Sequence, residues 1–81
     1  MVNVKPSDDF ERILSKLDKN IRIKIDKLID KIILNPKIGK PMMYDRKGTR
    51  EIYAKPFRFS YFYDKNTDTL YLLDLYHKKK Q

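Results

Sequence analysis

The sequence predicts an α+β fold in which a two-helix antiparallel hairpin packs on a small, twisted, mainly antiparallel β-sheet. In the first half, apolar residues recur at steps of three and four, which is the spacing of one helix face. In the second half, aromatic and aliphatic residues alternate with polar ones between turn residues, as in half-buried strands. The chain has 81 residues and no cysteine, so a single domain, residues 1–81, must be stabilised by its apolar core.

The first half is expected to form a short strand followed by the two helices. Valines alternate with polar residues over residues 1–5, which is typical of an edge strand. A helix over residues 7–19 follows, because Ser7 is a favourable amino-terminal cap and two acids come directly after it. The second helix spans residues 21–35, since the residue before Pro36 avoids helical backbone. A short polar break between the helices predicts that they are antiparallel.

The second half begins with a long loop and continues with three strands. Residues 36–48 have no regular period and contain both glycines and two of the four prolines. Loops of this length in small domains are often functional. The strands are predicted over residues 49–55, 57–64 and 69–78.

The turn at residues 65–68 sets the register of the last two strands. It predicts that Asp64 lies opposite Thr69 and that Arg58 lies opposite Leu75. The more apolar face should then pack on the helices, and it holds Phe57, Phe59, Tyr61, Tyr63, Leu70, Leu72 and Tyr76. The other face should be open, and it holds Arg58, Ser60, Phe62, Tyr71, Leu73, Leu75 and His77.

This register brings Arg58 and His77 within one diagonal step of each other on the open face. Asp74 is a counter-example, because the same register places this acid on the apolar face. A β-bulge near the end of the last strand would reverse the faces of the residues after it.

The charge of the chain indicates a polyanionic partner. Nineteen Lys and Arg stand against eleven Asp and Glu, which gives a net charge of +8. Nucleic acid or an acidic protein would supply the counter-charge. One histidine and no cysteine argue against a conventional zinc site, and we expect neither a metal nor a cofactor. No apolar run suits a signal peptide or a membrane span, so we expect a cytoplasmic protein without a membrane partner.

Four short strings, in their order and spacing, resemble the RelE/ParE toxin superfamily of toxin–antitoxin systems and its RelE branch in particular. They are Asn35-Pro36, Lys40-Pro41-Met42 leading to Gly48, Pro56-Phe57-Arg58-Phe59-Ser60-Tyr61, and Leu75-Tyr76-His77-Lys78-Lys79. The resemblance implies a metal-independent endoribonuclease that depends on the ribosome, cleaves mRNA in the A site through the RNA 2′-hydroxyl, and inhibits translation. It also implies a cognate RelB-like antitoxin, helical and partly acidic, that wraps the toxin.

The resemblance also implies roles for individual residues. Arg58 corresponds to the arginine that contacts the reacting phosphate, where a planar bidentate donor suits the chemistry. His77 corresponds to the general acid or base that ends the last strand, and Lys78 to the basic residue after it. The RNA backbone would be bound by Lys40, Arg46, Lys47, Arg50, Lys55 and Lys79. Each residue also has a structural interpretation, as an exposed strand arginine, a surface histidine or a solvated lysine.

The chain departs from the family pattern in two places. Some members carry two basic residues at alternate positions of the first central strand, where this chain has Glu51 and Tyr53. Some ribosome-dependent relatives carry a functional tyrosine past the last strand, and Tyr76 and Tyr53 are the candidates to compensate here. Two other functions therefore stay open: a ParE-type toxin that poisons DNA gyrase, which the His77-Lys78-Lys79 ending argues against, and a non-catalytic RNA-binding module.

Overall fold

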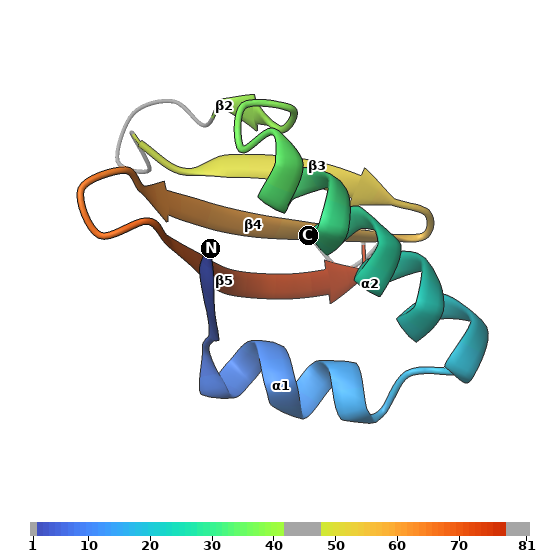
Figure 1. The fold of residues 1–81 in the computed structure, drawn as a ribbon. Coiled ribbons are helices and arrows are strands. Elements are labelled where there is room, and N and C mark those ends of the chain that lie inside the picture. The colour runs from blue at the N-terminus through green and yellow to red at the C-terminus, as the bar shows by residue number, and fades with distance from the viewer. Residues whose placement is uncertain (1, 42–47, 78–81) are drawn as a thin grey trace.

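The computed structural model describes residues 2–41 and 48–77 (Figure 1). The elements in chain order are β1 (Asn3–Pro6), α1 (Asp8–Ser15), α2 (Lys19–Leu34), β2 (Lys40–Pro41), β3 (Arg50–Ala54), β4 (Phe57–Asp64) and β5 (Thr69–His77). Within these residues the strands form one five-stranded sheet in the order β1-β5-β4-β3-β2. β1 lies parallel to β5, and the other neighbouring strands are antiparallel. The α+β architecture predicted from the sequence is confirmed.

Both helices cover the same face of the sheet. Phe10 of α1 is fully buried, as are Ile25 and Ile32 of α2, and they share one core with the sheet residues. The rings of Phe10 and Phe59 meet edge to face with their centroids 5.9 Å apart. The chain reverses direction after α1, so that α2 runs back across the sheet (Figure 1). None of the described helices is long and apolar enough to cross a membrane.

Several element bounds differ from the prediction, and two of the differences have local reasons. α1 ends at Ser15, because the amides of Lys16 and Leu17 bond to carbonyls three residues back and tighten the chain before α2. The predicted loop over residues 36–48 contains the short strand β2, which pairs with the beginning of β3. The bounds of β4 agree with the prediction.

The register of β4 and β5 is as predicted near the turn and wrong beyond it. Asp64 pairs with Thr69, but Arg58 pairs with Tyr76 and not with Leu75. The reason is a β-bulge: Tyr61 pairs with Leu72 and Ser60 with Asp74, which leaves Leu73 as an extra residue in β5.

The bulge exchanges the faces of every residue after Leu73. Leu75 pairs with Phe59 and is buried under the helices, where the sequence predicted an open position. Tyr76 moves to the open face and His77 to the helix-covered face, both opposite to the prediction. Asp74 now lies exposed on the open face, which explains why it did not fit the unbulged pattern.

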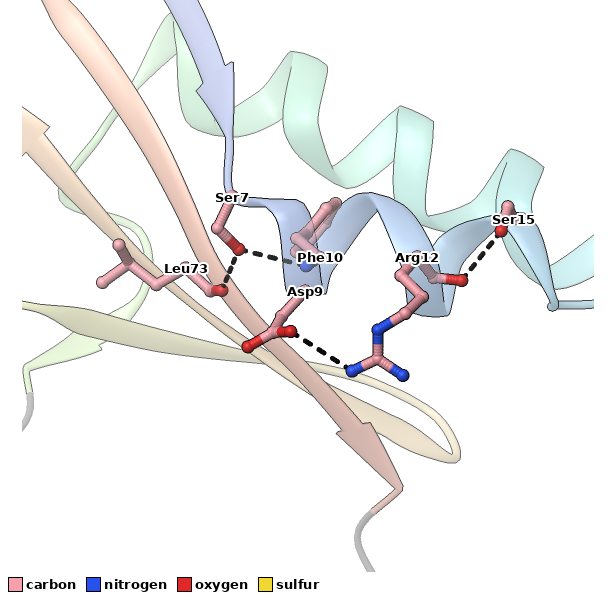
Figure 2. A network of polar contacts seen from close by, with 6 residues as sticks. All are labelled: Ser7, Asp9, Phe10, Arg12, Ser15 and Leu73. Atoms are coloured by element: carbon pink, nitrogen blue, oxygen red, sulfur yellow. Dashed lines mark hydrogen bonds and ion pairs between the residues drawn. The ribbon is translucent and has the colours of Figure 1, made fainter.

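Ser7 connects this bulge to the first helix (Figure 2). Its hydroxyl donates a hydrogen bond to the Leu73 carbonyl at 2.6 Å and accepts one from the Phe10 amide at 3.0 Å. The Ser7 amide also donates to the Leu72 carbonyl at 2.8 Å. A single residue therefore caps α1 and provides a hydrogen-bond donor for the unpaired bulge carbonyl.

We expect Ser7→Ala to lower the free energy of unfolding by about 1–3 kcal/mol, because it removes both the helix cap and the donor to Leu73. Urea denaturation followed by circular dichroism measures this loss. Ser15→Ala is the matched control, since the Ser15 hydroxyl donates an exposed hydrogen bond to the Arg12 carbonyl of the same helix and does not connect α1 to the sheet in the described part of the chain (Figure 2). Equal losses in the two variants would contradict a special role for Ser7.

Candidate functional site

Four side chains gather on the open face of the sheet, and we call them the Arg58 cluster: Glu51, Tyr53, Arg58 and Tyr76. Arg58 Nη1 donates to Glu51 Oε1 at 3.2 Å, with the two side chains 30% and 15% exposed. The Tyr76 hydroxyl donates to the second oxygen of the same carboxylate. The guanidinium carbon of Arg58 lies 5.9 Å from the centre of the Tyr53 ring.

Strand register explains why these side chains meet. Arg58 pairs with Tyr53 on β3 and with Tyr76 on β5, and directly paired residues share a face. Glu51 lies two residues before Tyr53 and therefore on the same face. Without the bulge at Leu73, Tyr76 would point into the helix-covered core.

The Arg58 cluster combines a hydrogen-bond donor for anions with a proton acceptor. A guanidinium carries five N–H donors, so its contact with Glu51 leaves others to bind a phosphate. The Glu51 carboxylate can accept a proton, and Tyr53, a residue that is 47% exposed, contributes an aromatic ring. Half-burial strengthens these interactions relative to open water.

His77 does not join this cluster, and the predicted convergence of His77 with Arg58 on one face is wrong. His77 pairs with Phe57, the neighbour of Arg58 on β4, and neighbouring residues of a strand point to opposite faces. The His77 and Phe57 rings pack edge to face with centroids 5.3 Å apart. The bulge is the physical cause, since it turns the end of β5 over.

The basic residues predicted to bind RNA are dispersed. Lys40 is exposed and pairs with Glu51, so it lies on the face of the Arg58 cluster. Arg50 pairs with Tyr61 and lies on the other face. Lys55 is exposed in the turn between β3 and β4. Four further predicted residues lie outside the described part of the chain: Arg46, Lys47, Lys78 and Lys79.

Arg50 holds the segment that precedes β2. Its Nη1 donates to the Gly39 carbonyl at 2.8 Å and to the Lys37 carbonyl at 3.3 Å. Beside it, the buried Tyr61 hydroxyl donates to the Pro36 carbonyl at 2.7 Å and accepts from the Gly39 amide at 2.9 Å. Burial raises the pKa of Tyr61, so the phenol stays protonated and keeps its donor.

Sequence reasoning missed the contact of Glu51 with Arg58 and placed Tyr76 in the core. In the sequence, Glu51 stood out only because it occupies a strand position where some family members have a basic residue. Its contact with Arg58 follows from the pairing of β3 with β4. The face of Tyr76 depends on the bulge, for which Asp74 was the only signal in the sequence. Within residues 2–41 and 48–77, no group of three or more His, Cys, Asp or Glu side chains is arranged to hold a metal ion.

Comparison with known proteins identifies a family. A family model described as the ParE-like toxin of type II bacterial toxin–antitoxin systems matches residues 4–80. The sequence has no significant match among curated proteins.

Solved structures of toxins share the fold at low sequence identity. The RelBE2 toxin–antitoxin complex of Mycobacterium tuberculosis matches at 23% identity with a TM-score of 0.83, over 95% of this chain and 98% of that one. The intact RelBE complex of Escherichia coli matches at 12% identity with a TM-score of 0.81, over 93% of this chain and 94% of that one. The YoeB/ParE toxin of Agrobacterium tumefaciens matches at 18% identity with a TM-score of 0.81, over 94% of this chain and 98% of that one.

The contacts of Arg50 predict a stabilising role that Lys40 does not share. We expect Arg50→Met to lower the free energy of unfolding by about 1–2 kcal/mol, because two backbone carbonyls lose a charged donor. Lys40→Met should change it by less than about 0.5 kcal/mol, since Lys40 is exposed. Chemical denaturation of both variants tests this, and an unchanged stability of the Arg50 variant would leave RNA binding as the better interpretation of Arg50.

Proposed function

This chain belongs to the ParE-like toxin family of type II bacterial toxin–antitoxin systems, and we propose that it is a toxin that cleaves mRNA in the ribosomal A site. The observation that supports this activity is the Arg58 cluster. A guanidinium, a carboxylate and two tyrosines meet there on an open sheet face. The proposed reaction is an attack by the RNA 2′-hydroxyl on the neighbouring phosphate, which inhibits translation and requires no cofactor.

In this proposal Arg58 binds the phosphate that reacts. Negative charge increases on the phosphate oxygens as the 2′-oxygen approaches, and a fixed guanidinium stabilises that charge more in the transition state than in the ground state. The strand pairs on both sides of Arg58 hold it in place before RNA arrives. Preorganised charges of this kind commonly make the largest contribution to catalysis.

Glu51 acts as the general base in this proposal, a role that the family resemblance offered to His77. Its carboxylate accepts the proton of the 2′-hydroxyl, the 2′-oxygen forms a bond to phosphorus, and the bond from phosphorus to the 5′-oxygen breaks. The Tyr76 hydroxyl, held on the same carboxylate, gives a proton to the departing 5′-oxygen. The products are a 2′,3′-cyclic phosphate and a free 5′-hydroxyl, and the proton on Glu51 returns to Tyr76 through solvent.

The partners follow from the family and from charge. The M. tuberculosis and E. coli structures are toxin–antitoxin complexes, and this chain is correspondingly expected to bind a cognate antitoxin. A RelB-like antitoxin with an acidic helical segment would offset the net charge of +8. The proposed place of action, on ribosomes, is the cytoplasm.

A second candidate is poisoning of DNA gyrase by a toxin of the ParE type. Two observations favour it: the matching family model is described as ParE-like, and the charge of Arg58 is balanced by Glu51 inside the protein. This candidate needs no general base and gives Glu51 only the role of a counter-ion.

We expect Arg58→Ala to reduce mRNA cleavage on programmed ribosomes by at least about 10²-fold, because the developing phosphate charge loses its donor. Arg12→Ala is the matched control, since the Arg12 side chain is 60% exposed and its ion pair within the described residues is with Asp9 of the same helix (Figure 2). Primer extension on the mRNA measures the cut. Wild-type protein that leaves mRNA intact but blocks supercoiling by purified gyrase would replace this proposal with the second candidate.

Glu51→Gln separates a general base from a counter-ion. The amide keeps the shape of the side chain but takes up no proton at neutral pH, so cleavage should fall by about 10²- to 10⁴-fold. RNA binding should stay equal or become tighter, because Arg58 loses its counter-charge. Single-turnover cleavage and binding of 2′-O-methyl RNA measure the two effects, and full cleavage by this variant would exclude Glu51 as the base.

A further inference from the structure

A second basic surface lies on the helix side of the sheet, and it includes Lys55, which the family resemblance assigned to RNA binding. It is a cavity of about 330 Å³ between α2 and the turn that joins β3 to β4. We call it the lysine groove. Its lining residues are Lys24, Lys27, Leu28, Lys31, Tyr53, Ala54 and Lys55.

The lysines of the groove are arranged by the helix. Lys24, Lys27 and Lys31 are exposed and follow one another at steps of three and four, so they lie along one face of α2. From first to last they span about 10 Å at the helical rise per residue. The Lys24 ammonium donates to the Lys55 carbonyl at 3.3 Å, which connects α2 to the turn.

Among the described residues that line the groove there is no acid, so the charge of its lysines is not balanced within the lining. The cavity between α1 and the beginning of α2 differs in this respect, because Glu11 and Asp26 line it together with Lys19 and Arg22. The lysine groove is therefore a local excess of positive charge and attracts anions.

Tyr53 connects the groove to the Arg58 cluster. Tyr53 is among the residues that line the groove and is 47% exposed, and its ring, on the open face, lies 5.9 Å from the Arg58 guanidinium carbon. β2 pairs only with Arg50 and Glu51, so in the described part of the chain no strand covers the edge of β3 at Tyr53. A chain-like ligand can thus pass from the lysines over this edge to Arg58.

We propose that the lysine groove binds the phosphate backbone of single-stranded RNA next to the phosphate held by Arg58, with a base stacked on Tyr53. A row of cations beside an exposed aromatic ring is the usual composition of a single-strand binding surface. An acidic protein segment would need apolar pockets for its anchors, and the groove offers only Leu28 and Ala54, which are half-buried and buried. The inference rests on the proposed action on RNA, and it adds the path that the RNA takes.

The test compares two triple variants that remove the same charge. Lys24→Gln, Lys27→Gln and Lys31→Gln are combined in one protein, and Lys5→Gln, Lys16→Gln and Lys19→Gln in the control, all of them exposed positions. The probe is a fluorescent 12-nucleotide 2′-O-methyl RNA, which the proposed reaction cannot cleave. Fluorescence anisotropy gives its affinity from 50 to 300 mM salt.

We expect the groove variant to bind the RNA about 10- to 100-fold more weakly than wild type. The slope of log affinity against log salt concentration should become less steep by about 2, because three contacts with single-strand phosphates are lost. The control should stay within about threefold of wild type, with its slope nearly unchanged. Equal losses in both variants would reduce the effect to net charge and overturn the inference. A groove variant that binds the RNA as wild type does would also overturn it. The same holds if the groove variant binds the RNA normally but binds a 12-residue polyglutamate peptide more weakly than wild type, since the groove would then recognise an acidic peptide.

This readout is independent of cleavage. If Arg58→Ala abolishes mRNA cleavage while the groove variant binds the probe like wild type, only the path of the RNA is wrong. If the groove variant loses the probe but wild-type protein cleaves no mRNA, the path stands and the nuclease proposal fails.

Discussion

The arrangement of the open face depends on one hydrogen bond between the two ends of the chain. The Ser7 hydroxyl reaches the carbonyl of Leu73, the residue that the β4–β5 ladder leaves out. A bulge inside a sheet needs a partner for its unpaired backbone groups, and the cap of α1 supplies one. Because the bulge turns over the end of β5, this contact determines that Tyr76 faces Arg58 while His77 faces the helices.

The Arg58 cluster differs from a simple basic cradle. Its only described carboxylate, Glu51, touches both Arg58 and Tyr76, so the centre is closer to neutral than the net charge of the molecule suggests. Under the proposed function, long-range attraction for RNA must then come from the surrounding lysines, while the cluster contributes orientation and chemistry. This separation of roles suits the proposed action on the ribosome, which is a much larger anionic particle.

The sequence predicted the fold class because the helical steps of the first half and the alternation of the second half are strong local patterns. The pairing of Asp64 with Thr69 was predictable for the same reason, since it lies next to its turn. The position of the bulge was not, because it depends on Ser7, 66 residues away from Leu73. The same limit applies to the parallel pairing of β1 with β5 and to the contact between Glu51 and Arg58.

The pairing of β1 with β5 also has a consequence for biosynthesis. Residues 3–6 are made well before their partner strand, which extends from Thr69 to His77. A nascent chain can form its helices early, but β1 and the Ser7 contact must wait until the last strand has emerged. The toxin therefore completes the Arg58 cluster only after β5 has been made, so this surface cannot exist on a nascent chain that lacks β5.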